Sequence, residues 1–191
     1  MENRTYFSLL HRFLHWTIAM GILLALFTAF LHHFWMNAHD IATTLTSSLA
    51  EKNITLSPDD AFMIARKISF PMFTWHFYAG FALVALLILR FIDFFVYGRK
   101  FISPLSKTAT SRQKFQGWLY VLLYIALTLI LIMGLLLRFG PRNEYHEIID
   151  KVHVWCGYFI ALFVVLHFGG LLLGEIGDDK GIVSKMINGK S

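Results

Sequence analysis

The sequence predicts an all-α integral membrane protein, a bundle of four membrane-spanning helices. Hydrophobic residues make up 57% of the 191 residues and charged residues only 15%, whereas a soluble domain carries about 25% charged residues. The apolar residues also gather into four long runs, each close to the roughly 20 residues that a helix needs to cross the hydrocarbon core. We therefore expect a single transmembrane domain over residues 1–191 and no soluble domain.

The first two spans begin differently. Residues 12–35 form the first. We expect this helix to be retained, because its apolar run leads into His32 and His33 and not into the small residues of a signal-peptide cleavage site. Residues 70–97 form the second span. Pro71 falls in its first turn, where the missing N–H costs no hydrogen bond.

The remaining spans are more uniform, and one long polar connection interrupts the series. Residues 115–138 and 148–174 form the third and fourth spans, and neither contains a proline. Residues 36–69 form a long polar loop between the first two spans. Within this loop, Ser57 is followed by a proline and two acidic residues, a pattern typical of an N-cap and first turn. We expect a short surface helix over residues 58–67.

Basic residues orient the spans in the membrane. Short loops rich in Lys and Arg face the cytoplasm. With four spans, both termini are then cytoplasmic and residues 36–69 lie on the outer side. The net charge of +5 comes from residues beside the spans, so it indicates a membrane surface and not a nucleic-acid partner. The connection between the second and third spans has no acidic residue and five basic ones: Arg99, Lys100, Lys107, Arg112 and Lys114.

The cysteine content excludes several kinds of redox site. Cys156 is the only cysteine, so the chain has no internal disulfide and no C-x-x-C pair for an iron–sulfur cluster or a structural zinc. The absence of a C-x-x-C-H motif also excludes a covalently attached c-type haem. Any haem in this chain is therefore held non-covalently.

Four histidines lie inside the expected spans, where an ionisable side chain is costly and indicates a functional site. The topology places His15 and His167 near the inner surface, and His76 and His153 near the outer one. His153 and His167 are fourteen residues apart, which is about 21 Å along a helix and only about 40° around it. They therefore share one face. Facing pairs of imidazoles inside a helical bundle are typical of bis-histidine haem ligation.

Other residues near these histidines have two readings each. Gly80 and Gly157 each follow a histidine by four residues, so they leave room for a flat macrocycle or make close helix contacts. Arg90 follows His76 by fourteen residues, and it either meets a haem propionate or extends to the cytoplasmic surface. Asp93 lies one turn later and could pair with it.

Five histidines remain outside this set. His11, one turn before His15, is the serious rival to His15 as a ligand. We expect the others to be interfacial or solvated. A transition-metal transporter could also use intramembrane histidines, but it typically adds acidic ligands at mid-membrane, and this chain has none there. The four surface histidines are His32, His33, His39 and His146.

Three motifs together resemble a known family. They are Arg12-Phe-Leu-His15-Trp16, His76-Phe-Tyr-Ala-Gly80 with Arg90, and the fourteen-residue spacing of His153 and His167. This combination resembles the bacterial four-helix di-haem cytochrome b superfamily. That superfamily includes the cytochrome b561 group, the cytochrome b subunits of nickel–iron hydrogenases and the gamma subunits of formate dehydrogenases. The resemblance covers nearly the whole chain.

The resemblance implies two non-covalent haem b groups and a quinone. It assigns His15 and His167 to the iron of the inner haem, and His76 and His153 to the iron of the outer haem. It also implies quinone exchange near one haem, often the inner one. A second copy of the chain stays open as a further partner. The long loop at residues 36–69 departs from many members and leaves the identity of the partner undetermined.

The expected function is therefore membrane electron transfer in the bacterial cytoplasmic (inner) membrane. We expect the chain to move electrons between a quinone and a redox partner at the outer face, as the cytochrome b subunit of a respiratory dehydrogenase or reductase. The chain has no nucleotide, flavin or iron–sulfur motif, so we expect no catalytic residue in it. Two alternatives stay open: a stand-alone membrane oxidoreductase acting on a small diffusible redox species, and a haem-free transporter.

Overall fold

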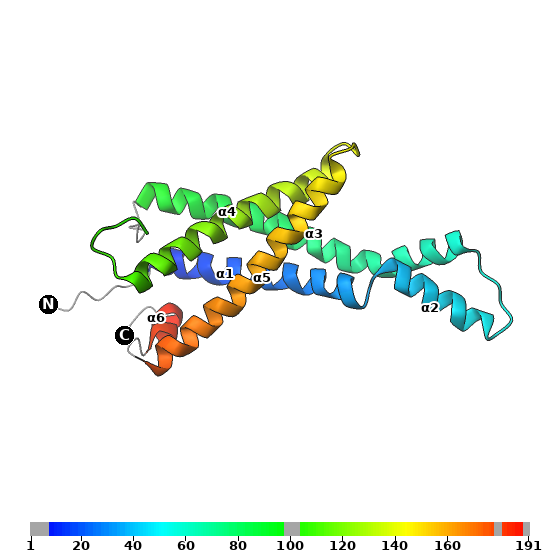
Figure 1. Ribbon diagram of the computed structural model, residues 1–191, viewed down its shortest axis with the longest axis horizontal. Coiled ribbons are helices and arrows are strands. Elements are labelled where there is room, and N and C mark those ends of the chain that lie inside the picture. Colours follow the sequence, from blue (N-terminus) through cyan, green and yellow to red (C-terminus); the bar gives the residue numbers. More distant parts are fainter. Residues whose placement is uncertain (1–7, 98–103, 178–180, 189–191) are drawn as a thin grey trace. The chain divides into compact units, whose positions relative to one another are not determined.

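The computed structural model describes residues 8–97, 104–177 and 181–188 (Figure 1). All secondary structure within these ranges is helical. Four of the helices, α1, α3, α4 and α5, are long and apolar enough to cross a membrane, which confirms the all-α integral membrane class. The helices in chain order are α1 (Leu9–Phe34), α2 (Ala38–Ala50), α3 (Pro58–Tyr97), α4 (Ser111–Phe139), α5 (His146–Ile176) and α6 (Ile182–Asn188).

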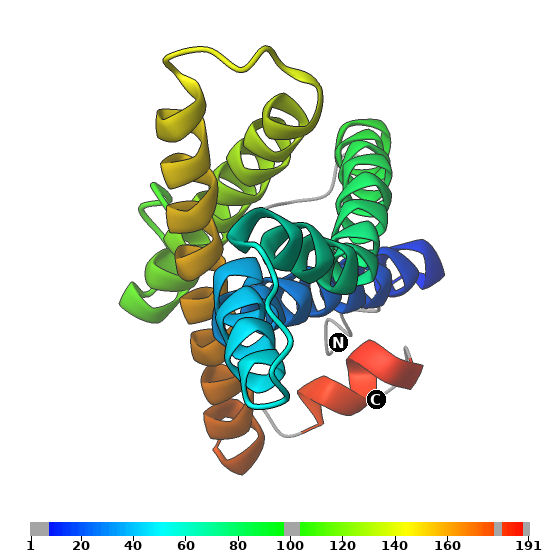
Figure 2. The same cartoon turned by 90° about the vertical axis from the view of Figure 1, so that its right-hand side faces the viewer.

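The described residues group into two compact units. The large unit holds residues 8–18 and the described part of 84–191, and the small unit holds residues 19–83. In the large unit, α4 and α5 pack together and run antiparallel, and α6 turns back beside the end of α5 (Figures 1 and 2). The large unit therefore carries the start of α1 and the end of α3 together with this hairpin.

Local signals set the bounds of the hairpin helices. Thr110 and Gln113 form a capping box at the start of α4: the Thr110 hydroxyl accepts the N–H of Gln113, and the Gln113 side chain accepts the N–H of Thr110. This arrangement satisfies two donors that a helix start leaves without a partner. Arg138 lies in the last turn of α4, where a cation favours the negative end of the helix dipole.

Helix α2 occupies part of the stretch that we predicted to be a polar loop. The Asn37 side chain accepts the N–H of His39 at 2.9 Å and caps its start. The Thr and Ser residues that suggested a loop bond back to carbonyls within the helix: Thr43 donates to His39, and Thr46 donates to Ala42. Their hydroxyls are satisfied inside the helix, so the loop prediction is wrong for residues 38–50.

Helix α3 is longer than predicted. The prediction of an N-cap at Ser57 is confirmed, since its hydroxyl accepts the N–H of Asp60 at 3.1 Å. The prediction of a separate surface helix over residues 58–67 is wrong, because the helix continues without interruption to Tyr97. Its 40 residues correspond to about 60 Å, twice the roughly 30 Å of the hydrocarbon core. Part of α3 must therefore extend beyond the membrane.

Pro71 consequently lies inside α3 and not in a first turn. It removes one hydrogen bond, to the carbonyl of Lys67. One buried stripe of α3 nevertheless continues on both sides of Pro71, with the three- and four-residue spacing of a helix face. This continuous packing outweighs the local penalty of the proline. The stripe consists of Ala61, Ala65, Ser69, Met72, Ala79 and Leu83.

Candidate functional site

The rings of His15 on α1 and His167 on α5 face each other in the large unit. Their centroids are 6.2 Å apart and their planes are inclined at 55°. A metal–imidazole bond is about 2.0 Å long and the bonding nitrogen lies about 1 Å from the ring centroid, so two imidazoles on opposite sides of one metal have centroids about 6 Å apart. The observed separation therefore fits a metal held between the two rings.

Aromatic packing orients these two rings. Phe163, one turn before His167 on α5, stacks on it with a centroid distance of 5.7 Å and an angle of 12°. Trp16 meets His15 edge-on at 5.6 Å. Neither imidazole makes a hydrogen bond to a residue that the structure describes. Ring packing, and not a hydrogen-bond partner, thus sets their orientation.

His153 lies on α5 nearer its start, and its ring is tied to α4. The Nδ1 atom lies 3.0 Å from the carbonyl oxygen of Ile130. A carbonyl only accepts, so Nδ1 donates its proton and the lone pair of the neutral ring is on Nε2. A Cβ at Gly134 would lie 3.1 Å from Cε1 of His153. The glycine therefore lets the ring lie close to the α4 backbone.

His76 on α3 is oriented in the same way within the small unit. Its Nδ1 lies 2.9 Å from the Thr28 hydroxyl on α1. That hydroxyl donates its own proton to the carbonyl of Leu24 or Ala25, at 3.0 and 2.9 Å. Its oxygen therefore accepts from Nδ1 of His76, and the lone pair of the neutral ring is again on Nε2. His76 and His153 belong to different units, and their pairing stays a prediction.

Arg90 joins a charged cluster that links three helices of the large unit. Its Nη1 donates to Nδ1 of His11 at 2.9 Å, and its Nε donates to the hydroxyl of Tyr124 at 3.2 Å. Nη1 also lies 3.6 Å from Asp93, the pair suggested by the sequence. Asp93 is only 2% exposed. The two roles predicted for Arg90, propionate contact and surface anchor, stay predictions.

The glycines that follow two of the histidines leave space beside them. Among the described residues, no atom lies within 4 Å of a Cβ built at Gly80. A Cβ at Gly157 would meet only Cδ1 of Ile130, at the ordinary contact distance of 3.8 Å. Neither glycine is therefore required by contacts within the described chain.

The first motif, Arg12-x-x-His15-Trp16, also has a structural role. Arg12 Nη1 donates to the carbonyl of Ile187 at 2.6 Å, and Trp16 Nε1 donates to the carbonyl of Met186 at 3.4 Å. Both carbonyls lie in the last turn of α6, where a cation is favourable. The two residues that bracket His15 thus hold α6 against the start of α1.

Comparison with known proteins identifies the family. A family model described as prokaryotic cytochrome b561 matches residues 6–189. The chain belongs to the prokaryotic cytochrome b561 family. Searches of curated proteins and of solved structures return no match. Membership confirms the resemblance and, with the four membrane-length helices, makes the chain a multi-pass protein of the bacterial inner membrane that takes part in haem b electron transfer.

The residues present fit the haem b that a cytochrome b561 carries. His15 and His167 lie close enough together that both would hold one haem iron, and the hydrogen bonds of His76 and His153 through Nδ1 put the lone pair of each neutral ring on Nε2. A metal-ligating histidine usually donates the N–H of its other ring nitrogen to a neighbouring acceptor, as these two do. Across the described residues, no three His, Cys, Asp or Glu side chains come together.

Sequence reasoning missed several residues that position this cytochrome's histidines. Thr28 resembles any threonine inside an apolar helix, and the carbonyl of Ile130 leaves no trace in the side-chain pattern. Gly134 did leave a signal, because a glycine in the middle of an apolar helix lowers helix stability and implies a close approach. Tyr124 lies in a run of apolar residues and gave no separate indication of its partner.

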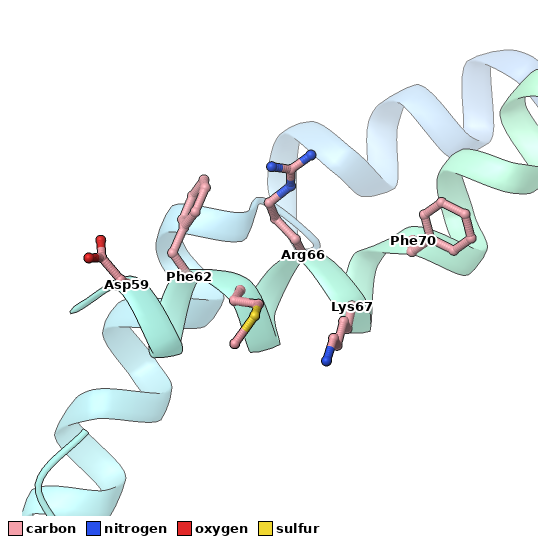
Figure 3. A pocket seen from close by; sticks show the side chains of 6 residues that line it. Asp59, Phe62, Arg66, Lys67 and Phe70 are labelled. Carbon is pink, nitrogen blue, oxygen red and sulfur yellow. The ribbon is translucent and has the colours of Figure 1, made fainter. Parts of the chain in front are cut away.

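A shallow pocket lies away from the histidines, on the first turns of α3 before Pro71 (Figure 3). Apolar side chains mix there with one acidic and two basic residues, and no histidine lines it. The pocket therefore contributes nothing to a haem site. Its lining residues are Asp59, Phe62, Met63, Arg66, Lys67 and Phe70.

Proposed function

We propose that this cytochrome b561 binds two haem b groups and moves electrons across the membrane between a quinone and a redox partner at the outer face. The observation that carries the proposal is the facing pair of His15 and His167, with ring centroids 6.2 Å apart. Few arrangements other than bis-histidine ligation explain two such imidazoles inside membrane-spanning helices. These two histidines hold the inner haem in this proposal.

His76 and His153 hold the outer haem. Each donates its Nδ1 proton, His76 to Thr28 and His153 to Ile130, and Nε2 of each ring would hold the iron. A hydrogen-bonded Nδ1 fixes the ring orientation and raises the basicity of the ligand. Gly80 and Gly157 would leave space for the macrocycle, since a Cβ at Gly80 would meet no described atom within 4 Å and one at Gly157 would meet only Ile130, at 3.8 Å.

The spacing on α5 explains how one chain serves both halves of the membrane. His153 and His167 lie about 21 Å apart along the axis and about 40° apart around it, within a hydrocarbon core of about 30 Å. A bound haem b supplies a one-electron iron couple at each position. The helix therefore presents both ligands on one face, one in each leaflet.

The basic residues define which end is inner. In the proposed orientation, the connection after α3 and both termini are cytoplasmic, by the preference of Lys and Arg for that side. The His15–His167 pair is then inner, and α2 with the first turns of α3 projects on the outer side. Substrate chemistry takes place in a partner, so the chain acts as the cytochrome b subunit of a respiratory dehydrogenase or reductase.

Reconstitution into vesicles tests the proposal. The purified protein is inserted into lipid vesicles that contain trapped ferricyanide, and a quinol is added outside. We expect ferricyanide to be reduced at a rate proportional to the amount of protein, because electrons pass through the chain. The His153→Ala variant should lose this activity, and the His146→Ala variant, at the first residue of the same helix, should retain it. Equal rates with and without protein would contradict the proposal.

A further inference from the structure

The charged cluster around Arg90 has a more specific consequence, which rests on the proposed function. We propose that Arg90 and Asp93 are positioning residues that set the reduction potential of the inner haem through their opposite charges. Arg90 favours the reduced state of that haem, and Asp93 favours the oxidised state. The cluster consists of Arg90, Asp93, His11 and Tyr124.

The first support is that the guanidinium is fixed in place. Arg90 uses Nη1 for His11 at 2.9 Å and Nε for Tyr124 at 3.2 Å, with Asp93 at 3.6 Å. These partners come from α1, α3 and α4. A cation extending to the membrane surface needs no such arrangement. The contacts therefore hold the charge at one position within the large unit.

The second support is the position of this charge relative to the inner ligands. His11, which accepts from Arg90, lies on α1 one turn before His15, a rise of about 6 Å. A charge at this range acts strongly because the surroundings are apolar and screen little. The side chain of Arg90 is 17% exposed and that of Asp93 only 1%.

The third support is the sign of each effect. Reduction of a haem iron removes one positive charge, so a fixed cation nearby raises the reduction potential and a fixed anion lowers it. The net charge near a redox site is one of the factors that set its potential. A purely structural ion pair predicts no such opposite pattern, since loss of either partner would disturb the same packing.

A redox titration of the purified, haem-loaded protein tests this inference. The inner haem is identified as the spectral component that the His167→Ala variant loses. We expect Arg90→Gln to shift its potential downward and Asp93→Asn to shift it upward. The double variant should lie between the two, near the original value, and the outer haem should not move. Lys114→Gln, which removes a cation about 15 Å along α4 from Tyr124, should leave both potentials unchanged.

His11→Glu keeps the test decisive if either single variant fails to accumulate. This change places an anion beside Arg90, so it should lower the inner potential. Shifts of the same sign in Arg90→Gln and Asp93→Asn, or equal shifts of both haems, would overturn the inference. A wild-type protein without two haems would instead overturn the proposed function, so the two failures are distinct.

Discussion

The histidines of the two proposed pairs are held by different kinds of contact. In the inner pair, His15 and His167 face each other at 6.2 Å and His167 stacks on Phe163, without a hydrogen bond to any described residue. In the outer pair, each ring donates through Nδ1, His76 to Thr28 and His153 to the carbonyl of Ile130. One pair is positioned by packing and the other by hydrogen bonds.

If the chain binds the two proposed haems, this difference means that they would be tuned by different means. A hydrogen bond to Nδ1 makes the imidazole a stronger electron donor to its metal, so the proposed outer site would be tuned through its ligands. The inner ligands lack such a bond within the described residues, but a fixed charged cluster lies near them. In the proposed account, the inner site would be tuned instead by the electrostatic field of Arg90 and Asp93.

Removal of a histidine ligand should have the largest effect, which is the loss of one of the two haems. His153→Ala should lose the outer haem and retain the inner one, and His167→Ala should do the reverse, because each pair coordinates its own iron. Each variant should thus hold one haem per chain, as measured by the ratio of haem absorbance to protein. His146→Ala, at the start of the same helix, is the control. Loss of both haems from each single variant would argue against two independent sites.

Crowding of His153 should weaken only the outer site. In Gly134→Ala the new Cβ would lie 3.1 Å from Cε1 of His153, so the ring must move from its place. Overpacking of this kind costs about 1–3 kcal/mol, or about a 5-fold to 150-fold loss in haem affinity. Haem release to a scavenging apoprotein measures the change. Gly169→Ala, whose Cβ would meet no described atom within 4 Å, should bind both haems normally.

Loss of the hydroxyl at Thr28 should have a smaller effect, on the reduction potential and affinity of the outer haem. Thr28→Val keeps the shape of the side chain but cannot accept the Nδ1 proton of His76. The ligand becomes a weaker donor, so the outer haem should have a higher reduction potential and about tenfold lower affinity. Thr28→Ser keeps the hydroxyl and should behave as the original protein does. An equal change in the inner haem would contradict the separate tuning of the two sites.

The contact between α1 and α6 should have the smallest effect. Arg12→Gln removes the charged donor to the carbonyl of Ile187, at a cost of about 1 kcal/mol. Amide hydrogen exchange in residues 182–188 should then be about fivefold faster, and both haems should remain bound. Trp16→Phe, which removes the longer bond to Met186, should have a weaker effect. Unchanged exchange in Arg12→Gln would show that other contacts hold α6.

The sequence was informative where function places a polar residue in an apolar background. His15 and His167 stood out because imidazole is costly in a membrane, and their facing arrangement agrees with the depth argument. Thr28 and the carbonyl of Ile130 could not be predicted, because an uncharged side chain and a backbone atom carry no comparable penalty. The partners of the outer histidines were therefore visible only in three dimensions.

The fold likewise has features that the sequence predicts and features that it does not. The four spans followed from long apolar runs, but the course of α3 did not. Pro71 suggested a helix start because local rules place proline there, whereas a stripe of small and apolar residues on both sides of it continues the helix. In α2, Thr43 and Thr46 suggested a loop, but their hydroxyls bond within the helix. Tertiary packing and side-chain bonding outweighed local preference in both places.

The haem content of the purified wild-type protein tests the central claim most directly. Quantitative haem extraction against protein concentration, with electron paramagnetic resonance of the oxidised sample, gives both the number of haems and their ligation. The account predicts two b-type haems per chain, both low-spin with two imidazole ligands. A stably folded protein with one haem or none would contradict it.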